Sequence, residues 1–199
     1  MRFFKNSLPH LTLLFGVLLW AAFFHSFIPF LTFAAILLHE VGHILGAKLT
    51  GIRLSGFRLF SFEARISLYG DLIPYKKELL ISFAGPLMNV LSFIVATAFG
   101  AKPFASDPLS FFATVSASLG FLNLLPIGDF DGGRILFCLL APTIGLTKAT
   151  VSCRALSFLF LFSLWCVSVY ALIRAGASLS LFLFSATLFV RIFTADSSS

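Results

Sequence analysis

The stretch Leu37-Leu38-His39-Glu40-Val41-Gly42-His43-Ile44-Leu45 places a His-Glu-x-x-His motif inside an apolar run. On a helix, residues with this spacing lie on nearly the same face, one turn apart. His39 and His43 can therefore direct their imidazoles at one metal ion, with Glu40 beside a metal-bound water. A zinc peptidase needs this arrangement, together with a third protein ligand and an open position for water.

The surroundings of the motif argue against a chance occurrence. Residues 30–38 and 44–49 are mostly apolar, as in a membrane-spanning helix. A charged group at membrane depth costs at least about 2.5 kcal/mol, so ionisable residues there indicate a functional site. In a soluble chain the same pattern would be weaker evidence, because it recurs by chance.

The composition is typical of an integral membrane protein. The chain has 199 residues, of which 59% are hydrophobic and 11% charged, and its mean hydropathy is +1.02. Soluble domains average about 25% charged residues. A spanning helix needs roughly 20 residues, so the length accommodates about six spans with short loops. We therefore expect a single membrane-embedded domain over residues 1–199, in the cell membrane and crossing it several times.

The apolar segments predict an all-α polytopic fold with about six transmembrane helices. The two apolar segments nearest the C-terminus, 154–173 and 178–193, contain neither acidic residues nor histidine and are expected to be scaffold. We expect a catalytic core over about residues 30–140, with accessory helices at both ends. The predicted spans are 8–26, 30–49, 78–99, a broken segment over 109–141, 154–173 and 178–193.

Residues 52–69 have a period of two, which predicts strands rather than a helix. We expect a small membrane-associated β-hairpin here, to which an extended substrate could add as a further strand. An amphipathic connecting loop is the alternative. The alternating apolar residues are Ile52, Leu54, Phe60, Phe62, Ile66 and Leu68.

The apolar segment 109–141 is interrupted by Asn123-Leu124-Leu125-Pro126-Ile127-Gly128-Asp129-Phe130-Asp131-Gly132-Gly133-Arg134. One proline, three glycines and two aspartates are incompatible with a regular lipid-facing helix. Broken backbone at membrane depth is tolerated only where protein or a watery cavity surrounds it. We therefore predict a discontinuous fourth transmembrane segment whose break faces the helix that carries the histidines.

The two aspartates of the break are the candidates for a third metal ligand. Asp131 precedes Gly132-Gly133, which leaves space for a metal or substrate to approach, and Asp129 is the competitor. Asp131 has a structural alternative as the N-cap of the helix that resumes there.

The basic residues predict the orientation in the membrane. The net charge is +6, but the 14 Lys and Arg residues are spread between apolar segments, so they do not indicate a nucleic-acid partner. If the N-terminus is cytoplasmic and there are six spans, all of these residues except Lys102 and Arg174 fall on or toward the cytoplasmic side. The positive-inside rule then predicts that both termini are cytoplasmic.

Three motifs, in this order, resemble the site-2 protease family of intramembrane zinc metalloproteases. Within that family the chain is most similar to the bacterial sporulation branch, which processes a membrane-tethered pro-sigma factor. The motifs are His39-Glu40-Val41-Gly42-His43, Ala84-Gly85-Pro86-Leu87-Met88-Asn89, and Asn123-Leu124-Leu125-Pro126 leading to Phe130-Asp131-Gly132-Gly133-Arg134.

The resemblance implies roles for individual residues. His39, His43 and Asp131 would bind one Zn²⁺ per chain, and Glu40 would be the catalytic base that activates a zinc-bound water. The family pattern selects Asp131 over Asp129. Asn89 and Asn123 match asparagines that lie near the site in relatives, and they are candidates for binding the substrate backbone or the oxyanion. For Asn89, an interhelical hydrogen bond is the alternative.

The expected function is therefore hydrolysis of a peptide bond in or near the transmembrane segment of a membrane-tethered protein. The expected partners are a single-span or membrane-tethered protein substrate and the lipid bilayer, with no nucleic acid. A regulatory membrane protein is not identified by the sequence. One alternative is a non-catalytic relative that binds membrane proteins, against which the intact Glu40 argues. Another is a divalent-cation transporter, a class that often shows two related halves, whereas this chain has no repeat.

Overall fold

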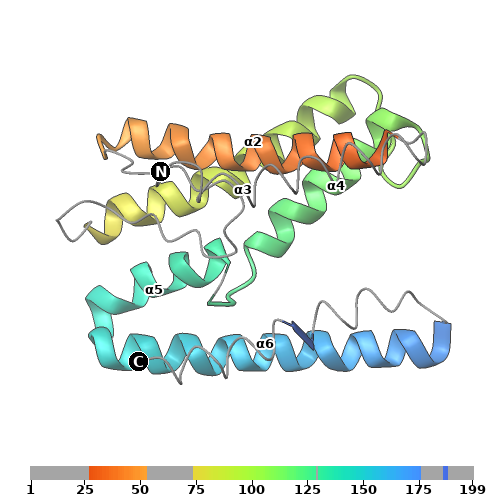
Figure 1. The fold of residues 1–199 in the computed structure, drawn as a ribbon. Helices are drawn as coiled ribbons and strands as arrows, with labels where there is room; N and C mark the ends of the chain where they lie inside the picture. Colours follow the sequence, from red (N-terminus) through yellow and green to blue (C-terminus); the bar gives the residue numbers. More distant parts are fainter. Residues whose placement is uncertain (1–26, 53–73, 129, 176–185, 188–199) are drawn as a thin grey trace, which may run out of the picture. The chain divides into compact units, whose positions relative to one another are not determined.

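The computed structural model describes residues 27–52, 74–128, 130–175 and 186–187. Within these ranges the structure is mostly helical, and no residue lies in a strand. The chain divides into two compact units, Met1–Leu124 and Leu125–Ser199. The main helices are α2 (Ile28–Leu49), α3 (Tyr75–Ala98), α4 (Pro108–Asn123), α5 (Asp131–Ile144) and α6 (Leu146–Ala175) (Figure 1).

Three of these helices, α2, α3 and α6, are long and apolar enough to cross a membrane. This finding supports a membrane protein. The predicted number of about six spans is not confirmed, because the described ranges contain three such helices. The predicted helix 8–26, nearly all of the predicted hairpin 52–69 and most of the predicted helix 178–193 lie outside the described residues.

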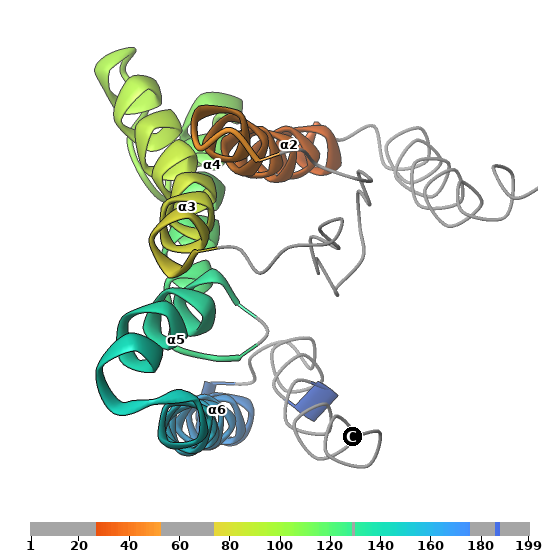
Figure 2. The ribbon, with the colours of Figure 1, turned by 90° about the vertical axis from the view of Figure 1, so that its left-hand side faces the viewer.

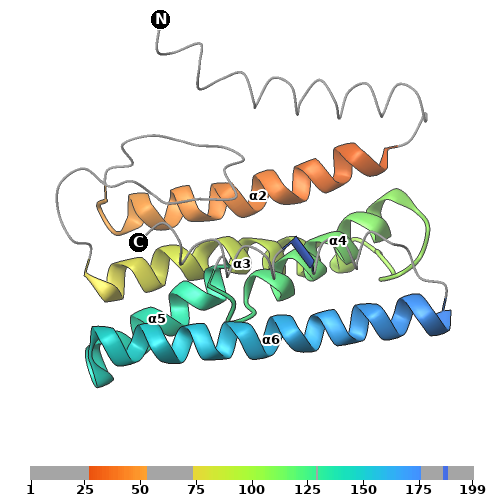
Figure 3. The ribbon, with the colours of Figure 1, turned by 60° about the horizontal axis from the view of Figure 1, so that its bottom comes forward.

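In the first unit, α3 packs against both α2 and α4, and α2 also contacts α4 (Figures 2 and 3). Small residues allow the α2 and α3 backbones to approach closely, as is common between membrane helices. A Cβ atom added at Gly42 would lie 2.9 Å from Gly85 Cα, and one added at Gly46 would lie 2.9 Å from Ala84 Cβ. The second motif therefore lies against the helix of the histidines.

In the second unit, α5 and α6 pack against each other. Gly145 connects them, and its φ of 85°, which is unfavourable for residues with a side chain, terminates α5. The helix predicted over 154–173 is present as α6, but α6 begins earlier than predicted, at Leu146. The predicted break within residues 109–141 is confirmed, since α4 ends at Asn123 and α5 begins at Asp131.

The start of α4 supplies a pH-dependent contribution to stability. Asp107 is its N-cap, and the carboxylate accepts a hydrogen bond from Ser110 N–H at 3.0 Å. Hydrogen bonding from Ser110 lowers the pKa of Asp107 below 3.8. A carboxyl group whose pKa is lower in the folded state stabilises the fold above its unfolded pKa. This contribution is lost as the pH falls through the folded pKa.

We expect Asp107→Ala to lower the thermal unfolding temperature at pH 7 by a small amount, and the difference from wild type to shrink below pH 3.8. Asp107→Asn is the matched control, because asparagine caps helices about as well as aspartate and does not titrate. Differential scanning fluorimetry of the detergent-solubilised protein between pH 7 and pH 3 measures this. Parallel curves for the wild type and Asp107→Asn would contradict the lowered pKa of Asp107, and unchanged stability of Asp107→Ala at pH 7 would contradict the cap.

Candidate metal centre

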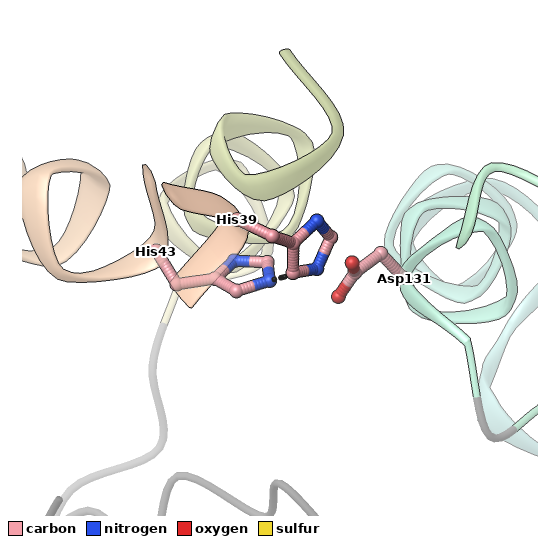
Figure 4. Close-up of side chains that lie close together, drawn as sticks. All are labelled: His39, His43 and Asp131. Atoms are coloured by element: carbon pink, nitrogen blue, oxygen red, sulfur yellow. Dashed lines mark hydrogen bonds between the residues drawn. The ribbon is translucent and has the colours of Figure 1, made fainter. Parts of the chain in front are cut away.

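His39 and His43 lie one turn apart on α2, and their Nε2 atoms face each other at 3.1 Å (Figure 4). The ring planes are nearly perpendicular, at 85°. Two nitrogen atoms bound tetrahedrally to one zinc ion, each about 2.05 Å from the metal, would be about 3.3 Å apart. The spacing predicted from the motif is thus realised, and the pair fits as two ligands of one ion.

The orientation of His43 is fixed by a carbonyl group of α3. His43 Nδ1 lies 2.8 Å from the carbonyl oxygen of Ile81, and because a carbonyl only accepts, Nδ1 must carry the proton and donate. In the neutral imidazole the lone pair is then on Nε2, the atom that faces His39. Metal-binding histidines usually donate their second N–H to an outer partner in this way. The Ile81 carbonyl has no signal in the sequence, because a backbone group carries none.

His39 is buried and is approached by the side chain of Asn89, which is fully buried. Asn89 Nδ2 lies 3.3 Å from His39 Nδ1. Asn89 is thus an interhelical hydrogen-bonding residue, the alternative left open for it, and its partner is a candidate metal ligand. Its candidate role in binding substrate is not tested by this contact.

Gly85 leaves the space that the two imidazoles occupy. A Cβ atom added there would overlap His43 Nε2 and would lie 2.9 Å from His39 Cε1. Any larger residue at this position of α3 would displace the rings. The absence of a side chain at Gly85 therefore lets α3 pack closely against the pair of candidate ligands.

Glu40 follows His39 on α2 and is partly exposed. Asn123 is the last residue of α4, and its Nδ2 donates to the Leu119 carbonyl of the same helix at 3.0 Å. The assignment of Glu40 as the candidate base rests on the sequence motif alone. The described contact of Asn123 is with its own helix.

In the second unit, Asp131 is the first residue of α5 and is buried (Figure 4). The N-cap of α5 is Phe130, so Asp131 does not have the capping role that was its structural alternative. Its place in the first turn of a helix is one where the helix dipole favours a negative charge. Asp129 lies outside the described residues.

The backbone that leads to Asp131 is held by α5 and α6. A Cβ atom added at Gly133 would overlap the Ile127 carbonyl and would lie 2.8 Å from Gly128 Cα, so the first turn of α5 packs on this loop. Ser157 Oγ of α6 accepts a hydrogen bond from Gly128 N–H at 2.9 Å. This partner satisfies a polar group of the break, as a membrane environment requires. Ser157 has no signal in the sequence, because it is one serine in an apolar span.

Comparisons with known proteins find a similarity to one peptidase family and to one solved fold. Residues 98–165 match peptidase family M50. A zinc metalloprotease of Methanocaldococcus jannaschii is 32% identical over 135 residues, which are 66% of this chain and 38% of the relative. Stage IV sporulation protein FB of Bacillus subtilis is 30% identical over 117 residues, which are 57% of this chain and 40% of the relative.

The chain thus spans 38% and 40% of the length of these two curated relatives. The solved structure of a site-2 protease from Methanocaldococcus jannaschii is similar with a TM-score of 0.62 and 24% identity, over 92% of this chain and 86% of that one. Putative zinc metalloproteases of Synechocystis and Mycobacterium tuberculosis also match. The sporulation branch is therefore one among several similar branches.

Proposed function

We propose that this chain, whose residues 98–165 match peptidase family M50, is an intramembrane zinc metalloprotease of the site-2 protease type. The observation that carries the proposal is the pair of imidazoles whose Nε2 atoms face each other at 3.1 Å on an apolar helix. The substrate would be a membrane-tethered protein, cut in or near its transmembrane segment.

We further propose that His39, His43 and Asp131 bind one Zn²⁺ per chain. Each of the three offers one ligand atom, an imidazole nitrogen or a carboxylate oxygen (Figure 4). Two imidazoles and one carboxylate, with a fourth position open, are a donor set of catalytic zinc sites. The second-sphere bond from His43 to the Ile81 carbonyl supports this assignment, because it leaves Nε2 available to the metal.

Glu40 is the proposed catalytic base. Zinc in this site would polarise the scissile carbonyl and lower the pKa of a bound water to about 7. Glu40 would accept a proton from the water as its oxygen bonds to the carbonyl carbon. The same carboxyl group would then protonate the leaving amine as the carbon–nitrogen bond breaks. The apolar residues around the motif would keep bulk water from the reacting groups.

The remaining features of the account are proposals of the same kind. They comprise a single peptidase domain over residues 1–199, about six spans with both termini cytoplasmic, and pairing of the unwound substrate with the segment 52–69. Such pairing would expose a peptide bond that a helix otherwise covers. The distribution of basic residues and the period of two in the sequence support these proposals.

The third ligand can be tested by a matched pair of substitutions. Asp131→Asn should weaken zinc binding at least about 10-fold, because an outer-sphere change alone costs that much, and should abolish cleavage. Asp129→Asn should leave zinc binding unchanged. Competition with a chromophoric chelator, followed by metal analysis of the purified protein, measures both. Loss of zinc in Asp129→Asn with retention in Asp131→Asn would reverse the assignment.

A further inference from the structure

Asn89 has a donor and an acceptor at the end of one buried side chain, and only the donor is used in the described structure. Its Nδ2 lies 3.3 Å from His39 Nδ1. Its Oδ1 is buried and has no hydrogen-bond partner among the residues that the structure describes. An unsatisfied buried acceptor destabilises a folded protein, so this amide requires an explanation.

The three contacts around the imidazoles form one consistent series of hydrogen bonds. His43 Nδ1–H donates to Ile81, so His43 Nε2 is an acceptor. The proton between the facing nitrogens must then be on His39 Nε2, 3.1 Å away. His39 Nδ1 is consequently an acceptor, and Asn89 Nδ2 donates to it.

A metal bound at His39 Nε2 is incompatible with the hydrogen bonds that His39 makes in this series. A bound metal needs the lone pair of His39 Nε2, so the proton of the neutral imidazole must be on Nδ1. Nδ1–H would then face the N–H groups of Asn89 Nδ2, and two donors would oppose each other at hydrogen-bond distance. Reversal of the Asn89 amide brings Oδ1 to this position. It removes the conflict and satisfies the buried oxygen at the same time.

We propose that Asn89 is the positioning residue of His39 and that its amide reverses when His39 binds the metal. The inference rests on the proposed function only in requiring a metal at the histidine pair. It gives Asn89 a role in holding the tautomer of His39 that leaves Nε2 free. This role differs from binding the substrate backbone or the oxyanion. Gly120 of α4 packs closely against Asn89. A Cβ atom added at Gly120 would lie 3.3 Å from Asn89 Cβ, so the glycine leaves room for the asparagine side chain.

Two substitutions separate this role from packing. Asn89→Asp offers an acceptor in either orientation of the side chain, and Asn89→Leu keeps nearly the same volume without any polar group. We expect zinc affinity to fall about 10- to 100-fold in Asn89→Leu, and to stay within about threefold of wild type, or rise, in Asn89→Asp. Ser116→Ala is the matched control, because Ser116 Oγ is a second buried atom of the first unit with no described hydrogen-bond partner. It should bind zinc as the wild type does.

The readouts are zinc affinity by chelator competition and the tautomer of His39 by ¹⁵N NMR of histidine-labelled protein in detergent. We expect His39 to carry its proton on Nε2 without metal and on Nδ1 with zinc. Unchanged affinity in Asn89→Leu, with a reduced cleavage rate, would overturn the proposal in favour of a substrate contact. An Nδ1 proton in both states would overturn the reversal. A wild type that binds no divalent metal would refute the proposed function itself.

Discussion

Glu40→Gln is expected to lower peptide-bond cleavage by about 10²- to 10⁴-fold while the protein still binds one zinc ion. Glutamine has the shape of glutamate but cannot accept the proton of the attacking water. The histidines and Asp131, which are the proposed ligands, are unchanged. Cleavage of co-expressed, tagged single-span reporter proteins, together with metal analysis of the purified chain, measures both quantities.

Glu78→Gln is the matched control for this experiment. Glu78 lies in the first turn of α3, and the proposed chemistry does not use it. The same chemical change there should leave cleavage within about twofold of wild type, because an interaction outside the transition state contributes little to the rate. Cleavage by Glu40→Gln at the wild-type rate, with zinc bound, would remove Glu40 from the mechanism. It would also favour a different activity for the site.

Gly85→Ala is expected to weaken zinc binding at least about 100-fold and to abolish cleavage, because ligand geometry must be held within about 0.5 Å. The added methyl group would overlap His43 Nε2 and crowd His39 Cε1. Both rings would have to leave the position in which their Nε2 atoms face each other. Alanine is otherwise the better helix former, by about 1 kcal/mol, so the helix itself is not expected to be destabilised.

Two other glycines separate the loss of the site from a general packing defect. Gly46→Ala would place its methyl group 2.9 Å from Ala84 Cβ and 3.2 Å from Ile81 Cα, on the same interface between α2 and α3, and no imidazole atom is among its three nearest neighbours. Gly128→Ala would meet only Ser157 Oγ, at 3.8 Å. We expect Gly46→Ala to lower thermal stability but keep zinc, and Gly128→Ala to keep both the thermal stability and the zinc of the wild type. Full zinc affinity in Gly85→Ala would contradict the arrangement of the rings.

The parts of the site that lie along one helix could be predicted from the sequence. The spacing of His39 and His43 determines their common face, because the helical period is fixed. The proline, glycines and aspartates of the fourth segment indicated the break before Asp131, because lipid does not tolerate unsatisfied backbone. In both cases the physical cause is local in the sequence.

The parts of the site that depend on contacts between helices could not be predicted in this way. The Ile81 carbonyl and Asn89 reach the imidazoles because α3 packs against α2 in one register. That register is determined by small residues such as Gly42 and Gly85, and no periodic pattern reports it. The early start of α6 was missed for another reason. Polar residues at the end of a helix resemble a loop in composition.

The most direct test of the central claim is a survey of new protein N-termini in membranes of cells that express the wild type or Glu40→Gln. Intramembrane proteolysis predicts N-termini inside or next to transmembrane segments that appear with the wild type and are absent with Glu40→Gln. These sites would also identify the substrate. Identical sets of N-termini from the two strains, each supplied with co-expressed single-span proteins and each containing a folded, zinc-loaded protein, would contradict the claim.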